Sequence, residues 1–119
     1  FTTGTPWLGV NHTHAAINVE AEREDDDSIL AFYRRLIALR KEHRIIAEGS
    51  IRFLERENDD VIAYERALGS ERLLVLCNFR ASDIAMPELH AAGEKLIGNY
   101  PGMAARLRPY EVVALRWVE

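Results

Sequence analysis

The stretch Leu73-Leu74-Val75-Leu76-Cys77 decides the fold of this 119-residue chain. A continuous apolar run of this length, bounded by turn signals, is typical of a β-strand that is buried on both of its faces. Gly69-Ser70-Glu71 forms the turn signal in front of it. The run therefore predicts the centre of a sheet, in a strand over residues 72–79.

Further strands are expected on both sides of this central run. Ile51 and Phe53 alternate with polar residues, as in a half-buried strand, and the acidic stretch 57–60 reads as a turn. The other expected strands cover residues 50–56, 61–68, 84–89, 95–100 and 110–118. Pro87 confines its strand to an edge or an irregular position. Short strands joined by tight turns predict an antiparallel β-sandwich over residues 49–119.

One long helix is expected in front of the sheet, over residues 28–44. Asp26 or Asp27 is a suitable N-cap, and the acidic run 20–27 favours the positive end of the helix dipole. Apolar residues spread over about half of the helix circumference, more than the stripe of about 100° that one contact requires. We therefore expect the helix to contact two bodies, one of them absent from this chain. The alternative is a single deep core contact.

Composition and charge exclude several classes of protein. The formal net charge of −4 argues against a nucleic-acid partner, because such domains are usually basic. No apolar run reaches the length of about 20 residues that a membrane span needs. The single cysteine, Cys77, excludes an internal disulfide framework and fits a reducing compartment. The opening Phe1-Thr2-Thr3-Gly4 indicates a piece of a longer protein.

The residues alone supply no active site. The acidic residues lie in the run 20–27 before the helix and in the turn 57–60. Neither position gives a reason for the raised carboxyl pKa that a glycosidase acid needs. His12 and His14 could face one metal ion from an extended stretch, but no third ligand lies nearby in the sequence. Cys77 is expected to be a small core residue, and Trp7 and Trp117 to be core anchors. We therefore expect no catalytic residue, metal or cofactor in this chain.

Several segments together resemble glycoside hydrolase family 13. Three pieces carry the first part of the resemblance: Phe1-Thr2-Thr3-Gly4-Thr5-Pro6-Trp7, Val10-Asn11 with Ile17-Asn18-Val19, and the helix text from Asp27-Ser28-Ile29 to Lys41-Glu42. The second part is carried by Leu73-Leu74-Val75 with Asn78-Phe79, then Asn99-Tyr100, then Leu107-Arg108-Pro109-Tyr110-Glu111. The pieces occur in order and are similar to oligo-1,6-glucosidases and related α-glucosidases of that family.

The resemblance implies a division of the chain at residue 48. Residues 1–48 are the end of a catalytic (β/α)8 barrel, with an irregular rim segment and the final helix, and residues 49–119 are the Greek-key C-terminal domain of the α-amylase type. The catalytic carboxylates lie in the absent upstream barrel, and Phe1 and Trp7 are candidates for the rim of the substrate pocket. Asn11-His12-Thr13-His14 departs from the Asn-Pro-Asn-Tyr that family members commonly have, so the subtype is left open.

The expected function is that of part of a retaining α-glucosidase acting on short isomaltose-type or maltose-type oligosaccharides. By itself this part is expected to be inactive and to stabilise the barrel. The alternatives are a part of a trehalose-6-phosphate hydrolase, or a free-standing β-sandwich that binds carbohydrate or protein. The expected partners are the upstream barrel and its oligosaccharide substrate, and the apolar helix face predicts a dimer of the isolated chain. The expected location is cytoplasmic.

Overall fold

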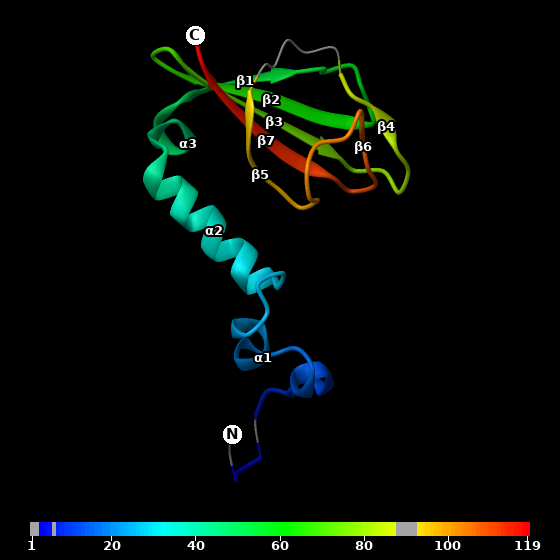
Figure 1. Ribbon diagram of the computed structural model, residues 1–119. Helices are drawn as coiled ribbons and strands as arrows, with labels where there is room; N and C mark the ends of the chain where they lie inside the picture. Colours follow the sequence, from blue (N-terminus) through cyan, green and yellow to red (C-terminus); the bar gives the residue numbers. More distant parts are fainter. Residues whose placement is uncertain (1–2, 6, 88–92) are drawn as a thin grey trace. The chain divides into compact units, whose positions relative to one another are not determined.

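The computed structural model describes residues 3–5, 7–87 and 93–119 (Figure 1). The chain divides into two compact units, Phe1–Glu42 and His43–Glu119. The first unit is helical, and the second contains all of the described strands. Among the described residues, no helix has both the length and the apolar character needed to cross a membrane.

Two short helices precede the long helix, the first in the segment 1–19 that we expected to be irregular and the second at the start of the acidic run 20–27. They are η1, His12–Ala15, and α1, Val19–Arg23. Asn11 caps the first, because its side chain accepts a hydrogen bond from the backbone N–H of Thr13 at 3.1 Å. Asn18 caps the second in the same way, accepting from the N–H of Ala21 at 2.9 Å. Such caps satisfy backbone donors that a helix leaves unpaired at its start.

The long helix is present as α2, Ile29–Glu42, but its cap differs from the prediction. Ser28, not Asp26 or Asp27, accepts from the backbone N–H of Ala31 at 3.1 Å. The carboxylate of Glu22 accepts from the N–H of Leu30 at 3.0 Å. Ser28 is correctly placed because its hydroxyl also donates to the carbonyl of Glu22 at 2.8 Å. The hydrogen bond from Ser28 to Glu22, six residues earlier in the chain, therefore explains why Ser28 is the cap.

The second unit is mainly antiparallel β-sheet, as predicted. It begins with a short helix, α3, Arg44–Glu48, which the sequence did not reveal. The five-stranded sheet has the order β1-β2-β3-β7-β5. Its strands are β1 (Ser50–Leu54), β2 (Val61–Leu68), β3 (Glu71–Asn78), β7 (Val112–Val118) and β5 (Glu94–Gly98). A second, two-stranded sheet pairs β4 (Ile84–Ala85) with β6 (Arg106–Leu107).

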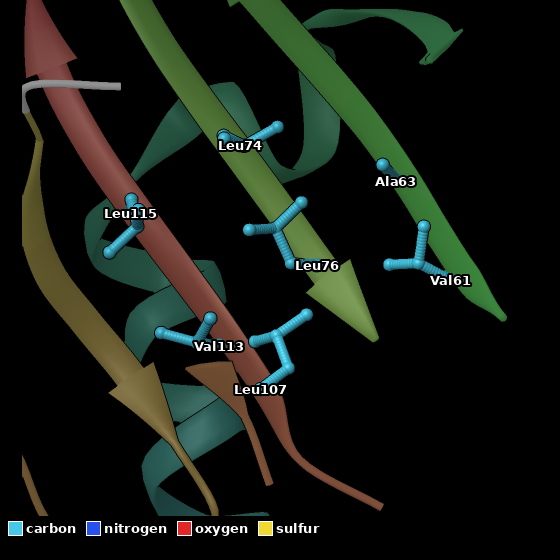
Figure 2. Close-up of a cluster of buried hydrophobic side chains, with 7 residues drawn as sticks. All are labelled: Val61, Ala63, Leu74, Leu76, Leu107, Val113 and Leu115. Atoms are coloured by element: carbon cyan, nitrogen blue, oxygen red, sulfur yellow. The ribbon is translucent and has the colours of Figure 1, made fainter. Parts of the chain in front are cut away.

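The central strand β3 is buried on both faces, which confirms the prediction from its apolar run. Leu74 and Leu76 point into one cluster, shown in Figure 2, which is completed by Val61, Ala63, Leu107, Val113 and Leu115. Leu73 and Val75 point into a second cluster with Ile45 and Ala114. Leu107 belongs to β6 and Ile45 to α3, so the small sheet covers one face of the large sheet and α3 covers part of the other.

Four expected strands are shorter than predicted, and the one expected over 95–100 is β5, which ends at Gly98. β1 ends at Leu54, because Glu55 has a φ of 49°, which leaves the extended region. β7 begins at Val112, because Tyr110 has a φ of 55° and lies in a turn. The strand expected over 84–89 is reduced to β4, and residues 88 and 89 of that prediction lie outside the described residues. Strand β6 is too short to leave a periodic pattern in the sequence.

Gly49 joins α3 to β1 at a very close approach. A Cβ atom at this position would lie 2.6 Å from the carbonyl oxygen of Ile45. Arg66 of β2 donates to the carbonyls of Ile45 at 3.1 Å and of Gly49 at 2.7 Å. The short helix is therefore fixed to the sheet through backbone carbonyls as well as through the side chain of Ile45.

Candidate functional site

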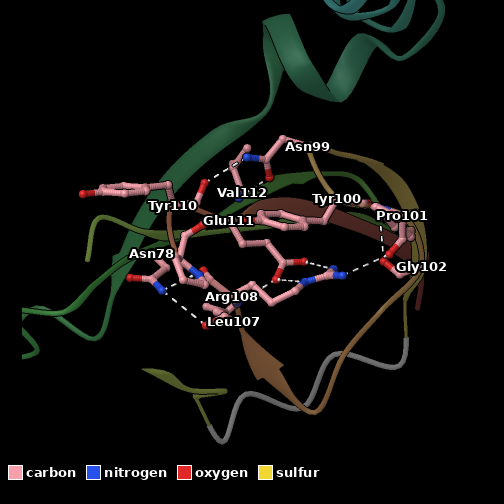
Figure 3. Close-up of polar contacts among 12 residues, drawn as sticks. Asn78, Asn99, Tyr100, Pro101, Gly102, Leu107, Arg108, Tyr110, Glu111 and Val112 are labelled. Atoms are coloured by element: carbon pink, nitrogen blue, oxygen red, sulfur yellow. Dashed lines mark hydrogen bonds and ion pairs between the residues drawn. The ribbon is translucent and has the colours of Figure 1, made fainter. Parts of the chain in front are cut away.

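The most extensive polar network in the described residues surrounds Glu111, just before β7 (Figure 3). The Glu111 side chain is 3% exposed, and its ion pair with Arg108 is bidentate. Arg108 donates from Nε to Oε2 at 2.9 Å and from Nη2 to Oε1 at 2.6 Å. The backbone N–H of Arg108 also donates to Oε2, at 2.8 Å. Paired, charge-assisted bonds of this kind are among the strongest in proteins.

The electrostatics of this pair favour the ionised carboxylate. The hydrogen bond from Arg108 lowers the pKa of Glu111, and burial opposes that shift less strongly. The same hydrogen bond raises the pKa of Arg108. The Arg108 guanidinium also lies 4.3 Å from the ring centroid of Tyr100, a cation–π distance. The hydroxyl of Tyr100 donates to the carbonyl of Pro109 at 2.9 Å, which fixes the ring.

Asn78, at the end of β3, connects the loop after β3 and the segment around Arg108 by hydrogen bonds to their backbones. Its Nδ2 lies within hydrogen-bond distance of the carbonyls of Ser82 at 2.8 Å, Leu107 at 3.2 Å and Arg108 at 2.8 Å. Its Oδ1 accepts from the N–H of Arg80 at 2.7 Å. The Asn78 side chain is therefore satisfied at both ends inside the protein, as a buried amide requires.

Asn99 performs a similar role for the turn that contains Tyr110. Its Nδ2 donates to the carbonyl of Tyr110 at 2.9 Å, and its Oδ1 accepts from the N–H of Val112 at 2.8 Å. These two bonds bracket Glu111 and support the left-handed backbone of Tyr110, which is unfavourable for a residue other than glycine.

The network is built to hold loops, not to transfer protons. Both carboxylate oxygens of Glu111 accept from Arg108, and the lowered pKa opposes a role as a general acid near neutral pH. The residues that carried the family resemblance in the β-part, Asn78, Asn99-Tyr100 and Arg108 to Glu111, meet here in space. We had not predicted their contacts, although the spacing of three between Arg108 and Glu111 was a usable signal.

The two predicted rim residues belong to the first unit. Phe1 lies outside the described residues. Trp7 is 92% exposed, so it is not the core anchor that its residue type suggested. Trp117, in contrast, is half-buried and packs against the cluster of Figure 2, as expected. The assignment of Phe1 and Trp7 to a substrate rim stays a prediction.

The structure does not place the two histidines in the extended stretch from which both could face one metal ion. His12 and His14 lie in η1, so residues two apart do not share a side as they would in an extended strand. Nδ1 of His14 instead lies 2.7 Å from the carbonyl of Asn11. In the part of the chain that the structure describes, no group of three or more His, Cys, Asp or Glu side chains is placed to hold a metal ion.

Cys77 lies in the second half of β3 and is half-buried. Burial raises the pKa of its thiol, which disfavours the nucleophilic thiolate. It contacts the cluster around Ile45 and Leu73. Cys77 is therefore a packing residue, as expected.

Comparison with known proteins gives consistent relatives for the whole chain. Residues 1–49 match the family model described as the catalytic domain of alpha amylase. An oligo-1,6-glucosidase of Halalkalibacterium halodurans is 40% identical over 93% of this chain and 22% of its own length. A Bacillus cereus oligo-1,6-glucosidase is 38% identical over 98% of this chain, again 22% of its length. A Bacillus subtilis trehalose-6-phosphate hydrolase is 34% identical over 98% of this chain and 22% of its own length.

Solved structures agree with these relatives. The trehalulose synthase MutB from Pseudomonas mesoacidophila aligns with a TM-score of 0.87 and 36% identity, over 98% of this chain and 22% of that one. A trehalose-6-phosphate hydrolase of Bacillus licheniformis aligns with a TM-score of 0.86 and 29% identity, over 99% of this chain and 23% of that one.

These similarities define the class as the glycoside hydrolases of family 13 and confirm the resemblance read from the sequence. Within that class the chain is oligo-1,6-glucosidase-like. It spans about a fifth of the length of the curated relatives that it matches.

Proposed function

We propose that this chain is part of a retaining α-glucosidase that hydrolyses short isomaltose-type or maltose-type oligosaccharides. The observation that carries the proposal is the 38–40% identity to oligo-1,6-glucosidases over more than nine-tenths of the chain. Retaining enzymes use one carboxylate as nucleophile and a second as acid and base, through a covalent glycosyl intermediate. In the proposed parent these carboxylates lie outside the present 119 residues, and substrate is bound there.

The proposed role of this part is to stabilise the catalytic barrel. Residues 1–48 form the end of that barrel, with α2 as its last helix, and residues 49–119 form a Greek-key C-terminal domain. The match of residues 1–49 to an α-amylase catalytic domain supports the first assignment. Phe1 and Trp7 lie at the rim of the substrate pocket in this proposal, and the exposure of Trp7 leaves its ring free for a sugar.

The exposed apolar side of α2 supports the proposal that another part of the parent protein packs against this helix. Ile29, Tyr33 and Ile37 are spaced by four residues, so they share one side of the helix, and all three are exposed. No residue of α2 is buried. A helix that packs only on its own small unit would bury its apolar stripe. In the isolated chain the same side of the helix is available for dimerisation.

A cytoplasmic location completes the proposal. The lone thiol of Cys77 has no partner cysteine in the sequence, which fits a reducing compartment.

Trehalose 6-phosphate is the second candidate substrate. It is favoured by the Bacillus subtilis trehalose-6-phosphate hydrolase, which is 34% identical over 98% of the chain. The two candidates differ in the phosphate group, which the parent must either bind or exclude.

The test uses the parent protein and the 119-residue chain, each purified. The parent is expected to hydrolyse p-nitrophenyl α-glucoside and isomaltose with retention of configuration, and the chain alone to be inactive. Turnover by the pure chain would refute the non-catalytic role. A parent that prefers trehalose 6-phosphate over isomaltose and maltose would replace the first candidate by the second, and a parent inactive on all three would refute both.

A further inference from the structure

A hollow lies beside the turn that joins β1 to β2. Its volume is about 330 Å³, at the lower end of the range of about 300–1,000 Å³ that small-molecule sites occupy. The residues that line it include the apolar Leu54, Val61 and Ala63 and the polar Glu55, Arg56 and Asn58. Val61 and Ala63 are buried (Figure 2), whereas the three polar residues are exposed. The hollow therefore has an apolar floor and a polar rim.

Arg56 differs from the other arginines of the second unit. Within the described part of that unit, each of the others donates to a carboxylate or to a backbone carbonyl. The guanidinium of Arg56 has no such partner among the described residues. A guanidinium carries five N–H donors in one plane. Those of Arg56 are therefore available to a ligand at the rim of the hollow.

The turn beside the hollow is held in an unusual backbone conformation. Glu55 has a φ of 49°, in the left-handed region that is unfavourable for a residue other than glycine. The N–H of Asn58 donates to the carbonyl of Glu55 at 2.9 Å, and Oδ1 of Asn58 accepts from the N–H of Asp60 at 3.0 Å. These bonds fix the turn without using Nδ2 of Asn58 or the carboxylate of Glu55. The rim therefore offers a second donor and an acceptor.

The charges of the turn favour a neutral ligand over an anion. Residues 55–60 contain four carboxylates and one guanidinium, so a phosphate or carboxylate group beside Arg56 would be repelled by its surroundings. Hydroxyl groups both donate and accept, so they can pair with Arg56 and Asn58 as acceptors and with Glu55 as donors. A sugar ring combines such hydroxyls with C–H groups that can cover an apolar floor.

We propose that this hollow binds a neutral glucosyl oligosaccharide, at a site separate from the substrate pocket of the parent. The choice of ligand rests on the proposed function, under which the parent meets such oligosaccharides as substrates. The site itself does not need the catalytic carboxylates, because the residues that line it belong to the second unit. An oligosaccharide held there stays close to the catalytic domain, which raises its effective concentration.

Titration of the 119-residue chain with isomaltotriose and, separately, with maltotriose tests the site by amide NMR. Saturable shifts are expected for the amides of residues 54–63 with at least one of the two sugars. Arg56→Ala should weaken that binding at least about fivefold, because hydrogen bonds from a charged donor are lost. Glu57→Ala is the matched control, since it removes a charge from the same turn at a residue that is not among those lining the hollow. The control should keep the wild-type affinity, and the amide spectra show whether each variant is folded.

Several outcomes of this titration would overturn the proposal. They are the absence of saturable shifts with both sugars, shifts confined to the first unit, and an equal loss of affinity in the two variants. Inorganic phosphate that shifts the same amides and displaces the sugar would also overturn it, in favour of an anion site. Binding by the chain, with a parent inactive on α-glucosides, would refute the proposed function alone. An active parent whose isolated chain binds neither sugar would refute this inference alone.

Discussion

Glu111 is a buried acidic residue whose role is structural. Its two oxygens accept from Arg108, and the loops around it are fixed by the side chains of Asn78 and Asn99. A buried carboxylate is stable only where such partners replace water. The turn before β7 is therefore held by this ion pair together with the two asparagine side chains.

Replacing Glu111 by Gln should destabilise the second unit by about 1–3 kcal/mol, because a charge-assisted pair is lost and Arg108 keeps a poorer partner. Urea unfolding followed by Trp117 fluorescence measures the change. Glu48→Gln is the control, because the side chains of the Arg44–Glu48 pair are 74% and 49% exposed and such surface pairs add little stability. An equally small effect of both substitutions would contradict the structural role of Glu111.

The same residue predicts a pH dependence. The pKa of Glu111 is lower in the folded chain than its ordinary value of 4.5, so the unfolded chain takes up the proton first as pH falls. The stabilisation is complete above that ordinary value and is lost as pH falls through the folded pKa. Urea midpoints measured from neutral pH downward should therefore fall more steeply for the wild type than for Glu111→Gln. Parallel profiles would show that another group controls acid unfolding.

At the scale of elements, the N-cap of α2 can be tested, because the structure assigns it to Ser28 and the sequence suggested Asp27. Ser28→Ala should cost about 1 kcal/mol of helix stability, because the N–H of Ala31 loses its acceptor. Asp27→Ala is the matched control, since that side chain was expected to cap the helix and the structure assigns the cap to Ser28. Amide hydrogen exchange of Ala31 reports the difference. Faster exchange in Asp27→Ala than in Ser28→Ala would contradict the observed cap.

The junction of α3 and β1 makes a second prediction at this scale. Gly49→Ala should displace α3 from the sheet, because the new Cβ would lie 2.6 Å from the carbonyl of Ile45. Gly9→Ala is the control, since no atom lies within 4 Å of its added Cβ. Exchange of the Arg66 guanidinium protons, which bond the carbonyls of Ile45 and Gly49, measures the displacement by NMR. Unchanged exchange in Gly49→Ala would show that the junction adapts.

The elements also show what a sequence can and cannot predict. Strands β2 and β3 could be predicted because periodicity and turn residues are local signals, and the apolar run of β3 is buried as expected. Helices η1 and α1 were missed because each rests on one asparagine cap in a segment without periodicity. The Glu111 network was missed because it joins residues some thirty positions apart, such as Asn78 and Arg108.

At the scale of the whole molecule, the apolar side of α2 predicts self-association of the isolated chain. Ile29→Lys with Ile37→Lys should shift sedimentation toward monomer, because two exposed apolar side chains are replaced by charges. Ala38→Lys adds a lysine to an exposed position on another side of the same helix and is the control. Equal sedimentation of wild type and double variant at all concentrations would contradict association through α2.

The position of β1 adds a second consequence for the isolated chain. It is the outermost strand of the described five-stranded sheet, so one row of its backbone groups points away from β2. Such a strand is a template for pairing with another chain, and lysine or proline usually protects it. Here Ile51 and Phe53 offer apolar contacts beside that template. In the isolated chain this edge is therefore a second route to self-association, and Ile51→Lys should weaken it.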